Sequence, residues 1–387
     1  MTSQTACDEP RPTINRAITP RIIMLVSLVT IVGVAALGGR QLSVRPFAIP
    51  KAIEANPIGQ RPGIEVVSTI PRSETGKYDL RDVALLENGD AWAVGYDGQH
   101  VDRVYFSKDI GKTWQPVDVP GTGFTLNAIS FSDSQHGWAV GGDGLIIRTR
   151  DGGLSWELLK PPIQAAADVR LPDLHAVQFA NASVGYLAGN ERFGSKTSDE
   201  VWGTVEVFCT KDGGDTWRQC YKENEPDTVF QITTVSESRA FFSLGDRLLR
   251  TDDQGQTWHR VSTSAKYISA IAFAPEGSGW LVGSHGVFQT SPDGGKTWQQ
   301  PASIMPDFGN RDWQGIAFNE DGTGLAVGEN STLAVTTDSG KTWQLQTTIK
   351  SDDLRAIQIQ NTRAVILGSH NAYSIDVRWS TISRRPD

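Results

Sequence analysis

Six aspartates recur at one position of an eight-residue pattern, and carboxylates at a fixed spacing are the first candidates for chemistry. Each pattern begins with Ser or Thr, places Asp third and Gly fifth, and ends with Thr or Ser followed by Trp. The aspartates are Asp109, Asp151, Asp212, Asp253, Asp293 and Asp338. Such carboxylates could work as a pair in glycoside hydrolysis, bind Ca²⁺ in an oxygen-rich loop, or accept the hydrogen bonds that close a tight turn.

The neighbouring residues favour the structural role. An Asp side chain can accept N–H groups two or three residues further on, and the glycine suits a turn position with φ > 0. Runs such as Asp151–Gly153 resemble a calcium loop, but the alternating Asp/Asn ligands of an EF-hand are absent. We therefore expect structural aspartates at hairpin tips, with no catalytic residue, no cofactor and no metal centre.

The tryptophan that closes each pattern gives the spacing of the repeat. The six are Trp114, Trp156, Trp217, Trp258, Trp298 and Trp343. Successive tryptophans lie 42, 61, 41, 40 and 45 residues apart, and a period of 40 to 45 residues is typical of β-propeller blades. The pattern itself is the motif known as the Asp-box.

A second repeat gives the number of blades. Upstream of each Asp-box lies an apolar segment that ends in glycine, such as Gly137–Gly141, and a seventh copy at Ala364–Gly368 has no Asp-box after it. The repeats predict an all-β, seven-bladed β-propeller over residues 63–387, with four short strands in each blade. The seventh unit lacks an outer strand, which Gly63–Pro71 can supply, and this pairing of the chain's two ends would leave no open sheet edge.

The residues before the propeller are predicted to direct its location. Ile22–Gly39 contains no charge and is just long enough for a membrane helix. We expect a cytoplasmic tail over 1–21, a transmembrane or signal-anchor helix over 22–39 and a Pro-containing tether over 40–62. The propeller would then lie in the periplasm or extracytoplasmic space, anchored to the inner membrane. The alternative is a cleaved signal peptide, with Ala36–Gly38 as the cleavage site, followed by secretion.

The cysteines and the net charge restrict the environment and the partner. Cys209 and Cys220 flank the third Asp-box on the two strands of one hairpin. Because disulfides persist in oxidising compartments, we hypothesise a Cys209–Cys220 bridge, with two unrelated buried thiols as the alternative. A net charge of −8 without a basic run argues against a nucleic-acid partner.

The Gly-Trp-Ala-Val-Gly segment at 137–141, repeated together with the Asp-box, resembles the photosystem II stability/assembly factor family of seven-bladed propellers. The resemblance covers residues 63–379 and implies a non-enzymatic factor that helps membrane-protein subunits to assemble. Two alternatives remain: an Asp-box glycoside hydrolase of the sialidase type, and an adhesion or sensor module. Sialidases carry Arg immediately before Ile-Pro, whereas Arg72 follows Ile70–Pro71 in this chain.

Irregular connections predict where a protein partner binds, because loops on a rigid scaffold carry function. The largest insertion is 190–204, and it should lie on the face opposite the Asp-boxes, together with the long connections between blades. Arg and aromatic residues, the types enriched at binding hot spots, occur in these segments. We predict that a membrane-associated protein partner contacts Arg103, Arg170, Arg192, Phe193, Trp202, Arg311 and Trp313. The alternative is a set of variable surface loops without a shared role.

Overall fold

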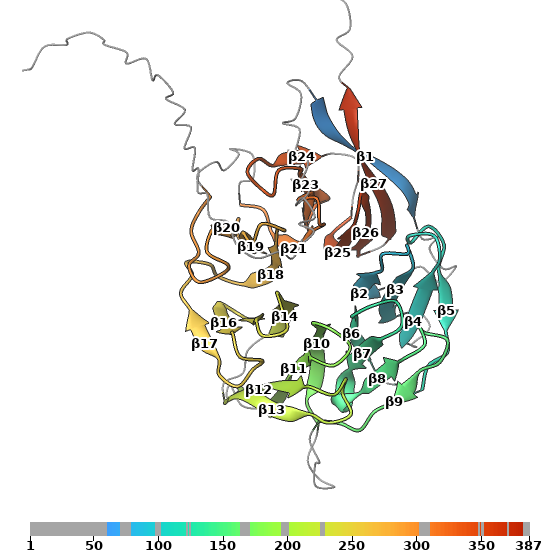
Figure 1. Cartoon of the computed structure of the whole chain (residues 1–387), viewed down its shortest axis with the longest axis vertical. Coiled ribbons are helices and arrows are strands. Elements are labelled where there is room, and N and C mark those ends of the chain that lie inside the picture. The colour runs from blue at the N-terminus through green and yellow to red at the C-terminus, as the bar shows by residue number, and fades with distance from the viewer. Residues whose placement is uncertain are drawn as a thin grey trace, which may run out of the picture. The chain divides into compact units, whose positions relative to one another are not determined.

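The fold is a ring of seven antiparallel sheets within one compact unit, residues 56–387 (Figure 1). The computed structural model describes residues 60–69, 79–96, 102–120, 123, 125–162, 171–194, 201–224, 229–301, 310–346, 349, 352–369 and 371–381. The predicted tail and membrane segment (1–39), and the tether up to residue 59, lie outside these ranges. Within them, no helix has the length and apolar character that a membrane span requires.

The blades follow one another along the chain. Blade 1 contains β2 (Asp79–Leu85), β3 (Ala91–Tyr96), β4 (Asp102–Ser107) and β5 (Gln115–Val117); blade 2 contains β6 (Leu126–Phe131), β7 (Gly137–Gly141), β8 (Ile146–Thr149) and β9 (Glu157–Leu158); blade 3 contains β10 (Asp173–Phe179), β11 (Gly185–Gly194), β12 (Val201–Thr210) and β13 (Arg218–Glu223). Blade 4 contains β14 (Val229–Thr234), β15 (Ala240–Leu244), β16 (Arg247–Thr251) and β17 (His259–Val261); blade 5 contains β18 (Ile268–Phe273), β19 (Gly279–Gly283) and β20 (Phe288–Ser291); blade 6 contains β21 (Trp313–Phe318), β22 (Gly324–Gly328), β23 (Thr332–Thr336) and β24 (Gln344–Gln346). Blade 7 contains β25 (Leu354–Gln360), β26 (Arg363–Gly368), β27 (Ala372–Thr381) and β1 (Gln60–Thr69).

The first strand of each blade faces the centre of the ring. Each of these inner strands contacts the inner strand of the next blade, and β25 of blade 7 contacts β2 of blade 1. The ring is therefore closed, and the prediction of an all-β, seven-bladed propeller is confirmed. Among the described residues, the one helical element is a short 3₁₀ turn, η1 (Gly142–Gly144).

The first and the last described strands, β1 and β27, both belong to blade 7, as the sequence predicted. Strand β1 pairs antiparallel with β27, from Gln60 opposite Thr381 to Thr69 opposite Tyr373. The strand begins three residues before the predicted Gly63, and it supplies the outer strand that β25–β27 lack.

Blade 5 departs from the expected four strands. Its outer segment makes only an isolated bridge between Thr290 and Gln299, with reciprocal N–H···O bonds of 2.9 Å. Pro301 follows two residues later, and proline has no N–H to continue a ladder. The prediction of four strands in every blade is therefore wrong for this blade.

Large side chains fill the space between the blades. Trp92, Trp138 and Trp280 on the second strands are 2%, 0% and 4% exposed, and each packs against an Asp-box of the following blade. Full burial of a large apolar side chain contributes about 2–3 kcal/mol to the free energy of folding. The Asp-box tryptophans then pack edge-on, as Trp343 does against Trp280 at a ring-centroid distance of 5.7 Å.

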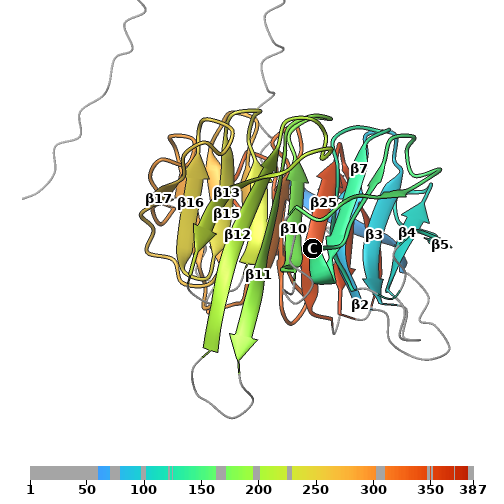
Figure 2. The ribbon, with the colours of Figure 1, turned by 90° about the horizontal axis from the view of Figure 1, so that it is seen from below.

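The ring has two chemically different faces. The turns between first and second strands lie on one side with the Asp-boxes, which we call the Asp-box face. The turns between second and third strands and the connections between blades lie on the other side, the connection face. Figure 2 shows β11 and β12 projecting beyond the other strands on the connection face, and each of them is ten residues long.

Candidate functional site

All six Asp-boxes close by the same side-chain hydrogen bonds. In the fourth box, Asp253 accepts the N–H of Thr257 at 2.9 Å and its hydroxyl at 2.6 Å. The hydroxyl of Thr251 donates to Asp253 at 2.8 Å and accepts the N–H of Gly255 at 2.9 Å. The backbone donor common to all six boxes thus lies four residues after the Asp, rather than the two or three that the sequence suggested.

In five of the boxes these bonds lower the pKa of the aspartate and favour its ionised form. The Thr257 hydroxyl and then its N–H lower the pKa of Asp253 to about 2, and the N–H of Thr297 shifts the pKa of Asp293 in the same direction. A carboxylate held ionised by its own turn does not serve as a general acid at neutral pH, where an effective catalytic pKa lies near the working pH. The geometry of the Asp-boxes is that of turns.

The connection face contains a different recurring feature, a β-bulge near the start of every inner strand. The strand register shifts at the same point in all seven blades, for example between Leu80 and Asp82 and between Leu126 and Ala128. The residues at the shift are Arg81, Asn127, His175, Phe230, Ser269, Gln314 and Arg355. Because each inner strand starts at the connection face, these positions surround that end of the central channel.

The channel is small and mostly polar. It has a volume of about 180 Å³ and is lined by residues from all seven inner strands. Arg81 donates to Asp102 at 2.8 Å and to the carbonyl oxygen of Leu126 at 2.6 Å, which joins blade 1 to blade 2. Asn127 donates to the carbonyl oxygen of Leu174 at 2.8 Å and joins blade 2 to blade 3. Two bulge side chains, Arg81 and Asn127, therefore link neighbouring blades at the channel entrance.

Asp82 is the acidic group of this channel. Its carboxylate accepts the N–H groups of Val83 and Ile129, at 2.8 and 2.9 Å, so it too joins blades 1 and 2. Burial raises the pKa of Asp82 to about 6, and the two N–H groups oppose this shift. Gln231, the corresponding residue of blade 4, accepts the N–H of Ile271 at 2.7 Å without carrying a charge.

Some of the predicted partner-binding residues lie on the connection face, but in different blades. Arg103 of blade 1 is about one-third exposed and lies 3.8 Å from Asp118. Arg311 is exposed just before β21 and donates to the Thr332 hydroxyl at 3.3 Å. Arg170 lies outside the described residues.

The prediction that Trp313 contacts a partner is wrong, because its side chain is fully buried. It packs 5.4 Å from Phe288, measured between ring centroids, in the core between blades 5 and 6. Trp313 occupies the first buried position of an inner strand, where Leu126 and Ile268 stand in blades 2 and 5.

The described part of the largest insertion, residues 190–194 and 201–204, is a two-stranded ribbon. Arg192 of β11 pairs with Gly203 of β12, and Phe193 pairs with Trp202. Strand β10 pairs only as far as Asn190, and β13 only as far as Val205, so residues 191–194 and 201–204 pair with each other alone among the described strands. We call these residues the β11–β12 ribbon, and the backbone places three of the predicted residues within it.

Sequence reasoning missed a second group of aspartates, which order the connection face. Asp173, Asp312 and Asp353 each precede the first buried residue of an inner strand and accept an N–H from the turn of the preceding blade. The donors are Asp143, His285 and Asn330, at 3.0, 2.6 and 2.9 Å, and all three have φ between 51° and 58°. The sequence does contain a pattern that marks these aspartates, because each one stands directly before a Leu-x-Ala or Trp-x-Gly segment at the start of an inner strand.

Comparisons with known proteins agree with the repeat. The model of the family described as "Photosynthesis system II assembly factor YCF48" matches residues 110–207 and 264–349, together just under half of the chain. The chloroplastic photosystem II stability/assembly factor HCF136 of Arabidopsis thaliana is 36% identical over 123 residues, which are 31% of this chain and 28% of the relative. The photosystem II assembly protein Ycf48 of Synechococcus sp. (strain JA-2-3B'a(2-13)) is 28% identical over 179 residues, 45% of this chain and 48% of the relative. The chain thus spans about half or less of the length of these curated relatives.

Solved structures share the fold at low sequence identity. A structure titled "YCF48 bound to D1 peptide" has a TM-score of 0.58 and 18% identity, and the match covers 82% of this chain and 97% of that one. YCF48 from Cyanidioschyzon merolae has a TM-score of 0.58 and 17% identity, with 80% and 98% covered. Together with the ring itself, these findings show an Asp-box (BNR) seven-bladed propeller that is similar to the photosystem II assembly factors.

Proposed function

We propose that this propeller is a non-enzymatic scaffold that binds an extended segment of a membrane-protein subunit on its connection face and assists the assembly of the complex. The observation that carries the proposal is the contrast between the faces. The Asp-box carboxylates accept hydrogen bonds within their own turns, whereas the projecting ribbon and the polar channel entrance lie opposite. The relatives named as assembly factors, and the similar structure titled "YCF48 bound to D1 peptide", support this class of partner.

The proposed location follows the N-terminal sequence. An uncharged segment at 22–39 would anchor the propeller to the inner membrane, or direct its export, and bring the ring close to membrane subunits on the extracytoplasmic side. We propose the residues on the ribbon, together with Arg103 and Arg311, as contacts for the partner. Arg side chains at the edge of such a face pair with carboxylates, and aromatic side chains supply apolar contact area.

The test is capture of subunits from detergent-solubilised membranes of the host by the tagged full-length chain. Subunits of one membrane complex should be enriched, and a variant carrying both Arg192→Ala and Trp202→Ala should lose most of that enrichment. Leu154→Ala is the matched control, because Leu154 is 89% exposed on the Asp-box face. Loss of capture in the Leu154 variant with retention in the ribbon variant would place the partner on the other face.

The enzymatic alternative is tested directly. Fluorogenic sialosides and a polysaccharide panel should give no turnover above the background without protein. Turnover at ordinary enzymatic rates, abolished by replacing one carboxylate, would contradict a scaffold role.

A further inference from the structure

The disulfide between Cys209 and Cys220 lies where the strand ladder of blade 3 is interrupted. Cys209 is on β12 and Cys220 is on β13, the outer strand. Val207 pairs with Tyr221 and Phe208 pairs with Gln219, so Cys220 is the extra residue of a β-bulge in β13. At this point of the outer strand, the bond between the sulfurs takes the place of a ladder pairing.

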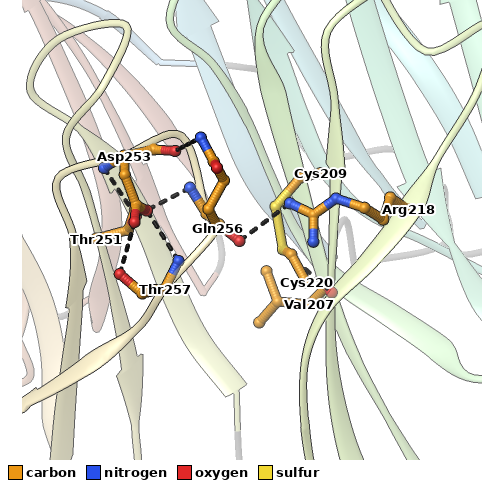
Figure 3. Close-up of a disulfide and its surroundings, with 9 residues drawn as sticks. Val207, Cys209, Arg218, Cys220, Thr251, Asp253, Gln256 and Thr257 are labelled. Carbon is orange, nitrogen blue, oxygen red and sulfur yellow. Dashed lines mark hydrogen bonds between the residues drawn. A yellow bond between two sulfur atoms is a disulfide. The ribbon is translucent and has the colours of Figure 1, made fainter.

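The same sulfurs form the surface on which blade 4 rests. Figure 3 shows the disulfide beside the fourth Asp-box, whose Asp253 and Thr257 are drawn. A Cβ on Gly255 of that box would overlap Cys209 Sγ and would lie 3.3 Å from Cys220 Sγ. Arg218 of β13 also donates to the carbonyl oxygen of Gly255 at 3.1 Å. Blade 4 is therefore held against blade 3 by the sulfurs and by a hydrogen bond from the strand that they fix.

At three other junctions the nearest side chains at this place are aromatic rings alone, whereas Gly255 faces the two sulfurs and, at 3.4 Å from such a Cβ, the Tyr186 ring. The corresponding glycines Gly153, Gly295 and Gly340 lie against Trp92, Phe241 and Trp280 of the preceding blade. An aromatic ring is not changed by the redox conditions, whereas a disulfide can be reduced to two thiols. Among these four junctions, the one between blades 3 and 4 has a covalent state that a chemical reaction can change.

We propose that Cys209–Cys220 is a site of thiol–disulfide exchange with a dithiol, and that its oxidation state sets the rigidity of the junction between blades 3 and 4. Cys209 is 5% exposed, whereas Cys220 is partly exposed on the outer strand and is the sulfur that is attacked. A thiolate of the dithiol bonds to Cys220 Sγ, the bond between the protein sulfurs breaks, and Cys209 leaves as a thiolate that takes up a proton.

The second thiol of the reductant completes the exchange. It attacks the mixed disulfide, releases Cys220 as a thiolate that is then protonated, and leaves the reductant as a disulfide. Two electrons thus pass from the dithiol to the protein, and a disulfide of more oxidising potential reverses the reaction.

Reduction loosens the junction for a steric reason. Two thiol sulfurs cannot approach as closely as two bonded sulfurs, and Gly255 closes the side towards blade 4. The displacement therefore falls on β13, where the bulge offers no ladder pairing to resist it. Strand β13 also carries Lys222, whose ammonium group lies 2.6 Å from Glu206, and Glu223, which pairs with Arg247 of blade 4. Strand β13 runs from the third Asp-box to the connection face, so its displacement reaches the proposed binding face.

The experiment compares oxidised and dithiothreitol-reduced full-length chain by alkylation and hydrogen exchange, without any partner. A Cys7→Ser background removes the third thiol. Both remaining cysteines should become alkylated under native conditions. Amide exchange in 218–223 and 251–258 should become at least about tenfold faster, with less than a twofold change in 332–346 of blade 6, because local opening is governed by local contacts.

A second variant keeps the proposal falsifiable if reduction is slow. Cys209→Ser combined with Cys220→Ser should reproduce the fast exchange of the reduced chain and should not respond to dithiothreitol. Resistance of the native disulfide to reduction, unchanged exchange after reduction, or acceleration in all blades together would each overturn the proposal. None of these readouts involves a partner, so a failure of the exchange site is distinct from a failure of the proposed function.

Discussion

The Asp-box face and the connection face are made by the same seven blades, yet the side chains repeat from blade to blade on the first face and vary on the second. On the Asp-box face, six turns repeat the same hydrogen bonds around Asp and the same left-handed glycine. On the connection face, each inner strand carries the same bulge, but the residue at the bulge ranges from Arg81 and Arg355 to Asn127 and Ser269. Uniform chemistry on one face indicates a requirement of the fold, and varied chemistry on a uniform backbone leaves room for recognition.

The largest expected effect concerns the packing of the Asp-box glycines. Gly153 has φ +85°, and a Cβ there would overlap the Trp92 ring, so Gly153→Ala should destabilise the fold by about 3 kcal/mol or more. Gly277 is the matched control, with φ +92° and no atom within 4 Å of a Cβ, and Gly277→Ala should cost about 1 kcal/mol. Urea unfolding measures both, and equal losses would mean that the ring contact contributes nothing.

The next prediction separates the two faces by function. Trp217→Ala removes a partly buried ring that lies 6.1 Å from Phe179, between centroids, and should lower the free energy of unfolding by about 2–3 kcal/mol. The Arg192→Ala and Trp202→Ala double variant should change the melting temperature little and weaken partner capture. Calorimetry and capture are measured on both variants, and capture that simply follows stability would contradict the assignment of the faces.

Asp82 should give the connection face its own pH dependence. Its pKa in the folded state is about 6, above its usual 3.8, so the folded state binds the proton more tightly than the unfolded chain does. Stability should therefore rise as the pH falls from 7.5 through 6 and 5, by at most about 3 kcal/mol. Asp82→Asn should be more stable than the wild type at pH 7.5 and should lack this rise.

An Asp-box carboxylate such as Asp253 should make stability depend on pH in the opposite direction. Asp253 has a folded pKa of about 2, so the stability it contributes is complete well above pH 3.8 and is lost as the pH falls through 2. Unfolding curves at pH 7.5, 5 and 3 separate the two groups. Parallel pH profiles of wild type and Asp82→Asn would refute the role given to Asp82.

The smallest expected effect is on the surface. Leu154 occupies the sixth position of the second Asp-box, where the first, fifth and sixth boxes have Lys112, Lys296 and Lys341. Because Leu154 is 89% exposed, Leu154→Lys should change stability by less than about 0.5 kcal/mol and should raise solubility. A loss above 1 kcal/mol would show that this side chain packs against something.

The sequence predicted the ring because its signals are local. An Asp-box closes within eight residues, and the Gly-ending strand recurs beside it, so the number of blades followed from counting. The β-bulges could not be predicted from the sequence, because a bulge is defined by the pairing between two strands. The bulge residues, such as Arg81 and His175, share no residue type. Trp313 was misplaced for a related reason: beside an irregular connection, a strand's first buried residue looks like part of the loop. The β11–β12 ribbon was located correctly as an insertion, but its pairing was not evident.

The joining of β1 to β27 has a consequence for the order in which the protein is made. Strand β1 is synthesised before any blade, yet its pairing partner ends at Thr381. Closing a chain loop of this length costs about 5 kcal/mol if nothing else is folded, and far less once six blades have brought the ends together. Strand β1 is thus expected to be the last strand of the ring to dock, and its hydrogen-bonding groups remain unpaired until β27 has been synthesised.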